Sequence, residues 1–228
     1  MRQIALDIGL ASGPTMANFF AGPNEAVLGH LRLWIGERTS PATRSPVPTY
    51  LWGASGSGKS HLLQAVRRAL REQGASVGWL DATVHTPPPF SEQWGAVLMD
   101  DVHLYTAAQQ QAAFNWFVNA QTHQRWVLAT GEVAPGELHL REDLRTRLGW
   151  GHLFSLQVLS EPDRRAVLRQ AADERGVLLS DEVMDFMLTR FSRDLGSLME
   201  LLDLMDGYAL QTKRAITIPL IKAMMEEA

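Results

Sequence analysis

A glycine-rich octapeptide carries the clearest chemical signal in this 228-residue sequence. Residues 53–60 read GASGSGKS and match the pattern G-x-x-x-x-G-K-[ST], in which glycines let backbone N–H groups turn inward around phosphate oxygens. Lys59 is expected to neutralise the β- and γ-phosphates, and the Ser60 hydroxyl to ligate Mg²⁺. A helix that begins at this point adds its positive dipole end. The predicted phosphate contacts are Gly53, Ala54, Ser55, Gly56, Ser57, Gly58, Lys59, Ser60 and His61.

Two acidic residues form the second signal, since Asp100 and Asp101 directly follow the apolar residues 96–99. Ligands of parallel sheets bind beyond the carboxyl ends of the strands, which predicts that Asp100 meets the metal end of the phosphate loop. We expect Asp100 and Ser60 to hold Mg²⁺, often through water. Asp101 is predicted to orient or deprotonate an attacking water, although most ATPases of this layout use Glu there.

Two further groups of residues have both a chemical and a plain structural interpretation. Thr130 and Glu132 follow the apolar residues 126–129, where they either sense the γ-phosphate and its water or belong to an ordinary loop. Arg145 and Arg147 lie near the end of a predicted helix. Each is either a solvated arginine or a finger offered to a neighbouring subunit's nucleotide, because a planar guanidinium suits transferring phosphoryl charge.

Apolar spacing and turn signals place these motifs on an α/β fold. The predicted strands are 49–52, 77–80, 96–99, 126–129 and 153–156, and the predicted helices between and before them are 25–34, 59–72, 106–122 and 141–148. This alternation predicts a five-stranded parallel sheet with helices on both faces. Asn24 is predicted to cap the first helix. Three consecutive prolines, 87–89, exclude a regular helix from the crossover before residue 96, so it is expected to be mostly loop.

Beyond residue 158 the pattern is helical only, with predicted helices at 161–175, 181–190, 195–211 and 218–225. The sequence therefore predicts three parts: a tail over 1–18, an α/β domain over 19–158 and an all-α domain over 159–228. Met199, Met205, Met224 and Met225 have helical spacing in the last part and are interpreted as core residues.

Composition argues against several other functions. The chain has 21 Lys and Arg against 25 Asp and Glu, a net charge of −4, which argues against holding DNA by charge alone. It has no Cys, which excludes disulfides, thiolate metal sites and Cys nucleophiles. Its seven His show no H-x-x-x-H pair. No apolar run has the length of a membrane span and no secretory leader is evident, so neither export nor membrane insertion is expected.

The phosphate loop, the paired aspartates, the strand ending at Thr130, the segment RLGWG at 147–151 and the helical C-terminal region together resemble AAA+ ATPases of the clade that contains the replication initiator DnaA. The resemblance implies ATP or ADP as the bound nucleotide. Residues 19–24, FFAGPN, are similar to the segment that packs near the adenine in that clade, which assigns Phe20 to the nucleotide site.

The resemblance also assigns the two arginines differently. Arg147 matches the clade's arginine finger and acts in trans, whereas Arg145 has no assignment. The lid arginine that contacts the γ-phosphate in the clade aligns with Gly196, so Arg193, one helical turn earlier, is the candidate substitute. This departure puts ATP turnover by the chain itself in question.

At the N-terminus, residues 3–8 read QIALDI and are similar to peptides that dock on the β sliding clamp of DNA polymerase III. Gln3 supplies amide hydrogen bonds, and Ile4, Leu6 and Ile8 supply apolar anchors. A DnaA-like ATPase with such a peptide, whose residues end after the lid, resembles the Hda family, the regulatory inactivators of DnaA.

This family resemblance implies a cytoplasmic protein, associated with the nucleoid through the clamp, that promotes hydrolysis of DnaA-bound ATP and meets DNA only through the clamp. A trans-acting arginine implies that DnaA, or further copies in a homo-oligomer, pack head to tail.

Two other functions stay open at this point. A self-contained ATPase that acts as a helicase loader or DNA-remodelling accessory would turn over ATP alone and bind single-stranded DNA in a salt-sensitive way. A nucleotide-binding interaction module would involve no hydrolysis at all. The absence of a basic stripe studded with aromatic residues counts against the first of these.

Overall fold

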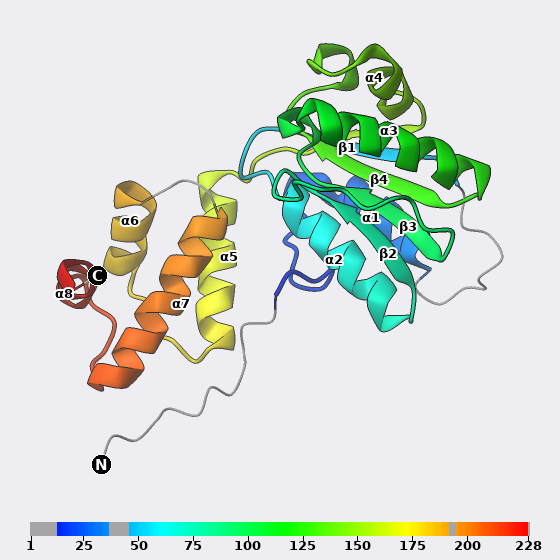
Figure 1. Ribbon diagram of the computed structural model, residues 1–228. Helices are drawn as coiled ribbons and strands as arrows, with labels where there is room; N and C mark the ends of the chain where they lie inside the picture. Colours follow the sequence, from blue (N-terminus) through cyan, green and yellow to red (C-terminus); the bar gives the residue numbers. More distant parts are fainter. Residues whose placement is uncertain (1–12, 37–45, 192–194, 228) are drawn as a thin grey trace. The chain divides into compact units, whose positions relative to one another are not determined.

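A computed structural model describes residues 13–36, 46–191 and 195–227 of the chain (Figure 1). These residues form two compact units, of which one spans Pro14–Val158 and the other contains the residues from Leu159 onward. The first unit is a sheet covered by helices, and the second is all helical.

Five parallel strands build the sheet of the first unit, in the order β2-β3-β4-β1-β5. Their bounds are β1 Thr49–Trp52, β2 Ser76–Leu80, β3 Trp94–Met99, β4 Trp126–Gly131 and β5 His152–Ser155. The predicted five-stranded parallel sheet is confirmed. Because all strands run the same way, the loops that follow β1, β3 and β4 leave the sheet at one edge, and these three strands are neighbours.

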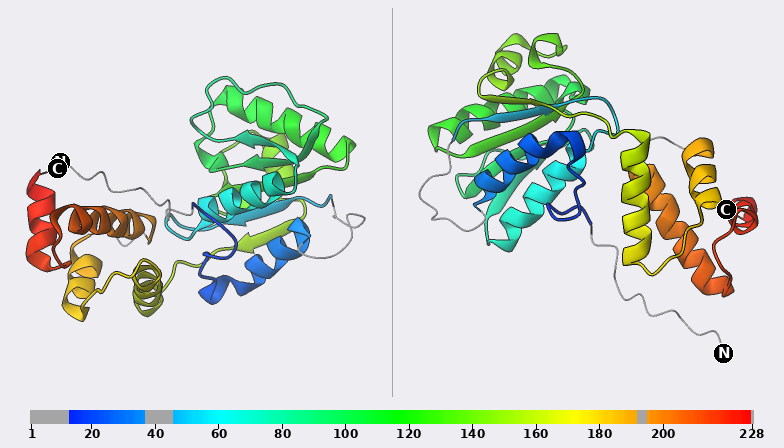
Figure 2. Two further views of the ribbon diagram at one scale, coloured as in Figure 1. Left: turned by 90° about the horizontal axis from the view of Figure 1, so that it is seen from below. Right: turned by 180° about the vertical axis from the view of Figure 1, so that it is seen from behind.

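Helices cover both faces of this sheet (Figure 2). One face packs against α1 (Glu25–Ile35) and α2 (Lys59–Glu72), and the other against α3 (Ala107–Thr122) and α4 (Glu142–Leu148). Short 3-10 turns lie at Gly22–Asn24, Val102–Leu104 and Pro135–Glu137. Side chains of neighbouring residues in one strand point to opposite faces of the sheet: Leu51 packs with α1 and α2, and Tyr50 packs with α3 and α4. The central strands β3 and β4 are mostly apolar because both of their faces are covered.

The crossover from β2 to β3 contains no helix, as its proline run predicts. Side chains of α3 fasten it instead. The Trp116 indole N–H donates to the Pro88 carbonyl at 3.0 Å. The buried Gln109 amide donates to three carbonyl oxygens, those of Asp81, Ala82 and Val84, each at 3.1 Å. The crossover therefore satisfies its polar groups without forming a helix of its own.

The predicted helix cap at Asn24 is wrong. Its side chain makes no capping hydrogen bond to α1. The 3-10 turn Gly22–Asn24 runs directly into the helix, and the Asn24 N–H already donates to the Ala21 carbonyl at 2.7 Å. The carboxamide is free to pair with the backbone of Gln157, just beyond β5: Nδ2 donates to its carbonyl at 3.0 Å, and its N–H donates to Oδ1 at 2.8 Å. Asn24 thus joins α1 to the end of the sheet.

The second unit contains four helices in its described residues: α5 Glu161–Glu174, α6 Asp181–Arg190, α7 Leu195–Thr212 and α8 Ile218–Glu227. Ser160 starts α5 with a capping box, in which its hydroxyl accepts from the Asp163 N–H and the Asp163 carboxylate accepts from the Ser160 N–H. Ser180 caps α6 by accepting from the Val183 N–H at 3.3 Å. Local sequence signals therefore fix where these two helices begin.

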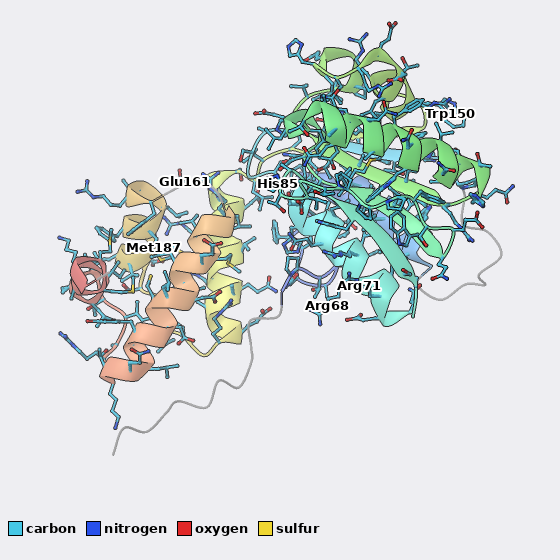
Figure 3. All side chains as sticks on the ribbon, viewed as in Figure 1. Arg68, Arg71, His85, Trp150, Glu161 and Met187 are labelled. Atoms are coloured by element: carbon cyan, nitrogen blue, oxygen red, sulfur yellow. The ribbon has the colours of Figure 1, made fainter. Side chains whose placement is uncertain are left out.

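Methionines contribute to the core of this helical unit, although not all of the predicted ones do. Met205 is buried, as are Met184 and Met187, the last of which is labelled in Figure 3. Met199 and Met224 are partly buried against the same core. Met225 is 53% exposed, so its interpretation as a core residue is wrong, because it lies on the outer side of α8. Within the described ranges, no helix combines the length and apolar character that crossing a bilayer requires.

Gly131, the last residue of β4, lies against the buried ring of Tyr50. The Tyr50 hydroxyl donates to the Val133 carbonyl at 2.9 Å, which holds the ring in place. A Cβ atom at position 131 would lie 2.0 Å from the Tyr50 hydroxyl oxygen. Only glycine fits here without displacing a buried, hydrogen-bonded side chain.

We expect Gly131→Ala to lower the free energy of unfolding by about 1–3 kcal/mol, the usual cost of overpacking a core. Denaturant unfolding followed by tryptophan fluorescence measures it. Gly136→Ala is the matched control, because a Cβ there meets no atom within 4 Å and stability should change by less than about 0.5 kcal/mol. Equal stability of the two variants would contradict this assignment.

Candidate nucleotide site

The phosphate loop between β1 and α2 has a backbone that requires glycine at two positions. Gly56 has φ 77° and Gly58 has φ 94°, a left-handed conformation that side chains rarely adopt. A Cβ at Gly58 would also lie 2.7 Å from the ring of Phe19. The loop sequence is therefore needed both for its turn and for the close approach of an aromatic residue from outside the motif.

Lys59 lies within this loop and is buried, with 6% of its surface exposed. Its ammonium group donates to the carbonyls of Gly53 at 2.8 Å and Ala54 at 3.0 Å. Beside it, the buried Ser57 hydroxyl has no hydrogen-bond partner among the described residues. Lys59 also begins α2, whose first N–H groups lack intrahelical acceptors. A cation, an unpaired hydroxyl and free N–H groups together suit a phosphate.

Asp100 is the centre of the polar network at the carboxyl edge of the sheet. Its Oδ1 accepts a hydrogen bond from the Thr130 hydroxyl at 2.6 Å and another from the Ser60 hydroxyl at 3.1 Å. Only 7% of Asp100 is exposed, and Thr130 is fully buried. One carboxylate therefore joins the end of β3, the end of β4 and the first turn of α2.

Burial raises the pKa of the Asp100 carboxyl above its ordinary value. The hydrogen bond from Thr130 opposes this rise, whereas the negative charge of Asp101 adds to it. A cation at this position would favour the ionised form of the carboxyl group. The electrostatics of the network thus suit a nearby metal ion.

Asp101 adopts an unusual backbone conformation directly after this carboxylate. Its φ is 46°, in the left-handed region, which is uncommon for a non-glycine residue and concentrates at functional sites. The Asp101 N–H donates to the Thr130 hydroxyl oxygen at 2.8 Å. Thr130 thus holds both aspartates, one through its hydroxyl hydrogen and the other through its oxygen.

A histidine that the sequence analysis did not assign lies between the other two predicted residues. His103 Nδ1 is 3.9 Å from Asp101 Oδ1, and its Nε2 is 3.7 Å from Glu132 Oε2. Asp101 lies two residues before His103, but Glu132 follows a different strand, so no spacing in the sequence links Glu132 to His103. The structure therefore brings together the four residues predicted at the carboxyl ends of β3 and β4: Asp100, Asp101, Thr130 and Glu132.

His61, the residue after Ser60, anchors a segment that precedes the first helix. Its Nε2 is 3.2 Å from the Thr15 carbonyl and 3.1 Å from Asn18 Oδ1; both oxygens accept, so Nε2 carries the hydrogen. Burial lowers the pKa of His61, and the contact with Thr15 opposes this shift. Residues 14–18, predicted to lie in the tail, therefore pack on the α/β unit instead.

The aromatic residue that lies against the phosphate loop is Phe19, whereas Phe20 is the one predicted to pack near the adenine. The Phe19 ring lies over Gly58, and its centroid is 5.5 Å from that of His61. Phe20 is half-buried, and its place near the adenine stays a prediction. Adjacent phenylalanines cannot be told apart by sequence pattern, because the turn that orients them depends on Thr15 and Asn18.

The two candidate arginines lie on α4, which packs through Leu144 and Leu148 on the layer formed with α3. Arg147 is exposed and Arg145 is half-buried. Neither guanidinium has an ion-pair partner in the described part of the chain. Trp150, just beyond the helix, is 58% exposed (Figure 3). Arg147 thus extends from a well-packed helix toward solvent.

Several predicted residues lie outside the described ranges. They are the clamp-peptide residues Gln3, Ile4, Leu6 and Ile8, and the substitute lid residue Arg193. Gly196 is described and lies exposed in the first turn of α7.

The donor set fits Mg²⁺ bound together with a nucleotide. No group of three His, Cys, Asp or Glu side chains in the described residues is arranged to hold a metal. Mg²⁺ commonly uses one or two protein oxygens and completes its shell with phosphates and water. Ser60 and Asp100 offer a hydroxyl and a carboxylate oxygen 3.1 Å apart, which matches that pattern.

Known proteins resemble this chain in both units. A family model described as Hda, lid domain, matches residues 161–225. An uncharacterized protein of Haemophilus influenzae is 31% identical over 233 residues, covering 98% of each chain.

Solved structures share the fold. Domain III of the Thermotoga maritima replication initiation protein DnaA matches with a TM-score of 0.72 at 18% identity, covering 93% of this chain and 95% of that one. AMPPCP-bound DnaA from Aquifex aeolicus matches with a TM-score of 0.66 at 21% identity, covering 84% of this chain and 64% of that one. The Thermotoga maritima RuvB Holliday junction branch migration motor matches with a TM-score of 0.62 at 17% identity, covering 89% of this chain and 68% of that one.

The predicted AAA+ architecture, an α/β unit with a helical lid region, is confirmed by these matches. The similarity to the Haemophilus influenzae protein extends beyond the lid, over nearly the whole chain. This chain therefore belongs to the Hda-like AAA+ proteins of the DnaA clade.

Proposed function

We propose that this chain binds ATP or ADP with Mg²⁺ and regulates replication initiation by promoting hydrolysis of DnaA-bound ATP. The main observation that supports a nucleotide site is the network in which the hydroxyl groups of Ser60 and Thr130 both donate to the Asp100 carboxylate. Among the similar structures, DnaA from Aquifex aeolicus is bound to AMPPCP, an ATP analogue, which supports an adenine nucleotide.

Each part of the nucleotide would meet a different part of this site. The loop N–H groups and Lys59 would hold the phosphates, and Phe19 with His61 would border the loop on the side of the N-terminal segment. Ser60 and Asp100 would hold Mg²⁺, which neutralises phosphate charge. Asp101 would orient an attacking water, with Thr130 fixing its backbone.

The hydrolysis that matters most in this proposal takes place on DnaA. Arg147 is exposed on a short, packed helix, so its guanidinium is accessible to a neighbouring protein. Arginine stabilises the charge of a transferring phosphoryl group when a partner supplies it in trans. Gly196 at the lid position supplies no such charge to the chain's own nucleotide. These two features favour a donated finger over a self-sufficient ATPase.

We expect Arg147→Ala to reduce stimulation of DnaA's ATP hydrolysis by about 10³-fold or more, the usual cost of losing an arginine finger. The measurement is release of phosphate from DnaA preloaded with radiolabelled ATP, with DNA-loaded clamp present. Arg145→Ala on the same helix is the matched control and should keep most of the stimulation. Undiminished stimulation by Arg147→Ala would overturn the assignment.

The same assay separates the alternative function. A self-contained ATPase acting as a helicase loader would hydrolyse ATP without DnaA and would bind single-stranded DNA. Rapid turnover by the chain alone, unaffected by Arg147→Ala, would favour that function over the regulator.

We further propose that residues 3–8 bind the β sliding clamp in the bacterial cytoplasm, so that the chain associates with DNA only through the clamp. The net charge of −4 supports this division, because an acidic chain gains little from direct contact with phosphates. Head-to-tail packing with DnaA, or with further copies of this chain, would then present Arg147 to a neighbour's nucleotide.

Replacing Gln3 and Leu6 together by Ala should abolish capture of the chain by immobilised clamp, since it removes the amide and the central apolar anchor. Surface plasmon resonance measures the binding. Ala5→Ser with Asp7→Asn is the control within the same peptide, because both changes lie between the predicted anchors. Clamp binding that survives in the Gln3 and Leu6 variant would show that another surface is used.

A further inference from the structure

We propose that His103 is a positioning residue of the nucleotide site, which holds the carboxylates of Asp101 and Glu132 together and offsets their charge toward a γ-phosphate. The inference rests on the proposed nucleotide site and adds to it a residue outside every motif used to recognise that site. It makes His103 a determinant of the preference for a triphosphate over a diphosphate.

The geometry places the imidazole ring between two acids from different strands. Nδ1 faces Asp101 at 3.9 Å, and Nε2 faces Glu132 at 3.7 Å. His103 lies in the 3-10 turn Val102–Leu104 that follows Asp101, whereas Glu132 follows β4. A ring with one nitrogen toward each acid joins the loops that follow two neighbouring strands.

His103 is also the one basic side chain with a nitrogen within 4.0 Å of either acid's carboxylate oxygens in the part of the chain that the structure describes. The ammonium group of Lys59, in the phosphate loop, donates instead to the carbonyls of Gly53 and Ala54. The Nδ1 atom of His103 is buried and has no hydrogen-bond partner among the described residues. A buried polar atom without a partner is costly, so it favours a rearrangement in which the ring donates to Asp101.

The position of these acids explains why the effect should depend on the γ-phosphate. The Asp101 N–H is bonded to Thr130, and Thr130 is bonded to Asp100, the proposed metal ligand. Asp101 therefore directly follows Asp100 after the end of β3, and Glu132 lies two residues after Thr130, just past the end of β4. Two carboxylates there repel a γ-phosphate, and ring N–H groups turned toward them partly offset their negative charge and reduce that repulsion. A diphosphate lacks the group concerned.

The test compares binding of the nonhydrolysable analogue AMPPCP and of ADP, each with Mg²⁺, by isothermal titration calorimetry of the full chain. We expect His103→Gln to weaken AMPPCP binding roughly two- to fivefold, the range of a partly exposed charge interaction, and to leave ADP binding unchanged. His103→Lys places N–H donors beside the same two acids and should keep AMPPCP affinity near that of the unmodified protein.

Two further variants make the result specific. Glu132→Gln in the His103→Gln background removes one of the two acids, so AMPPCP affinity should return to within about twofold of the unmodified protein. His123→Gln is the matched control, because His123 forms a comparable pair with Glu92, at 3.8 Å, just before β4 and thus at the opposite end of that strand. It should change neither affinity.

Three outcomes would overturn the inference: unchanged AMPPCP affinity in His103→Gln, equal weakening of AMPPCP and ADP, or no recovery with Lys. Equal weakening would show a purely structural role. Failure of the unmodified protein to bind either nucleotide would instead overturn the proposed function, and the inference with it.

Discussion

The hydrogen bonds that Asp100 accepts from Ser60 and Thr130 are the interaction on which the rest of the site depends. They require that β3 and β4 end, and that the helix after β1 begins, at the same edge of the sheet, which the strand order β2-β3-β4-β1-β5 provides. Burial of this carboxylate raises its pKa and leaves its charge in need of a partner. A phosphate loop on one side and Asp101 on the other therefore form one site, because one buried acid links them.

The buried network around Asp100 differs in kind from the exposed Arg147: the first suits a nucleotide bound by this chain, and the second suits a nucleotide bound by a partner. The residues around Asp100 are fixed by buried contacts and suit tight binding. Arg147, on an outer helix, has no ion-pair partner in the described residues and suits a partner's phosphates. We propose that nucleotide binding stabilises the shape of the α/β unit and that Arg147 supplies catalytic charge across an interface with DnaA.

Sequence patterns predicted the features that depend on local chemistry. The phosphate loop and the two aspartates are each set by a few consecutive residues, and buried strands are recognisable as apolar runs. The features that sequence missed depend on contacts between distant segments. Phe19 is oriented by a turn bonded to His61, His103 meets an acid from another strand, and Asn24 pairs with Gln157 instead of capping its helix. None of these partners can be inferred from spacing along the chain.

The most direct test of the central claim is whether nucleotide binding depends on both Mg²⁺ and the Asp100 network. Calorimetric titration with ATP should show that Mg²⁺ raises affinity about tenfold or more in the unmodified protein, and that Asp100→Asn removes this gain, since a neutral amide is a poor ligand for the ion. ATP affinity that is the same with and without Mg²⁺, or a Mg²⁺ effect that survives in Asp100→Asn, would contradict the account.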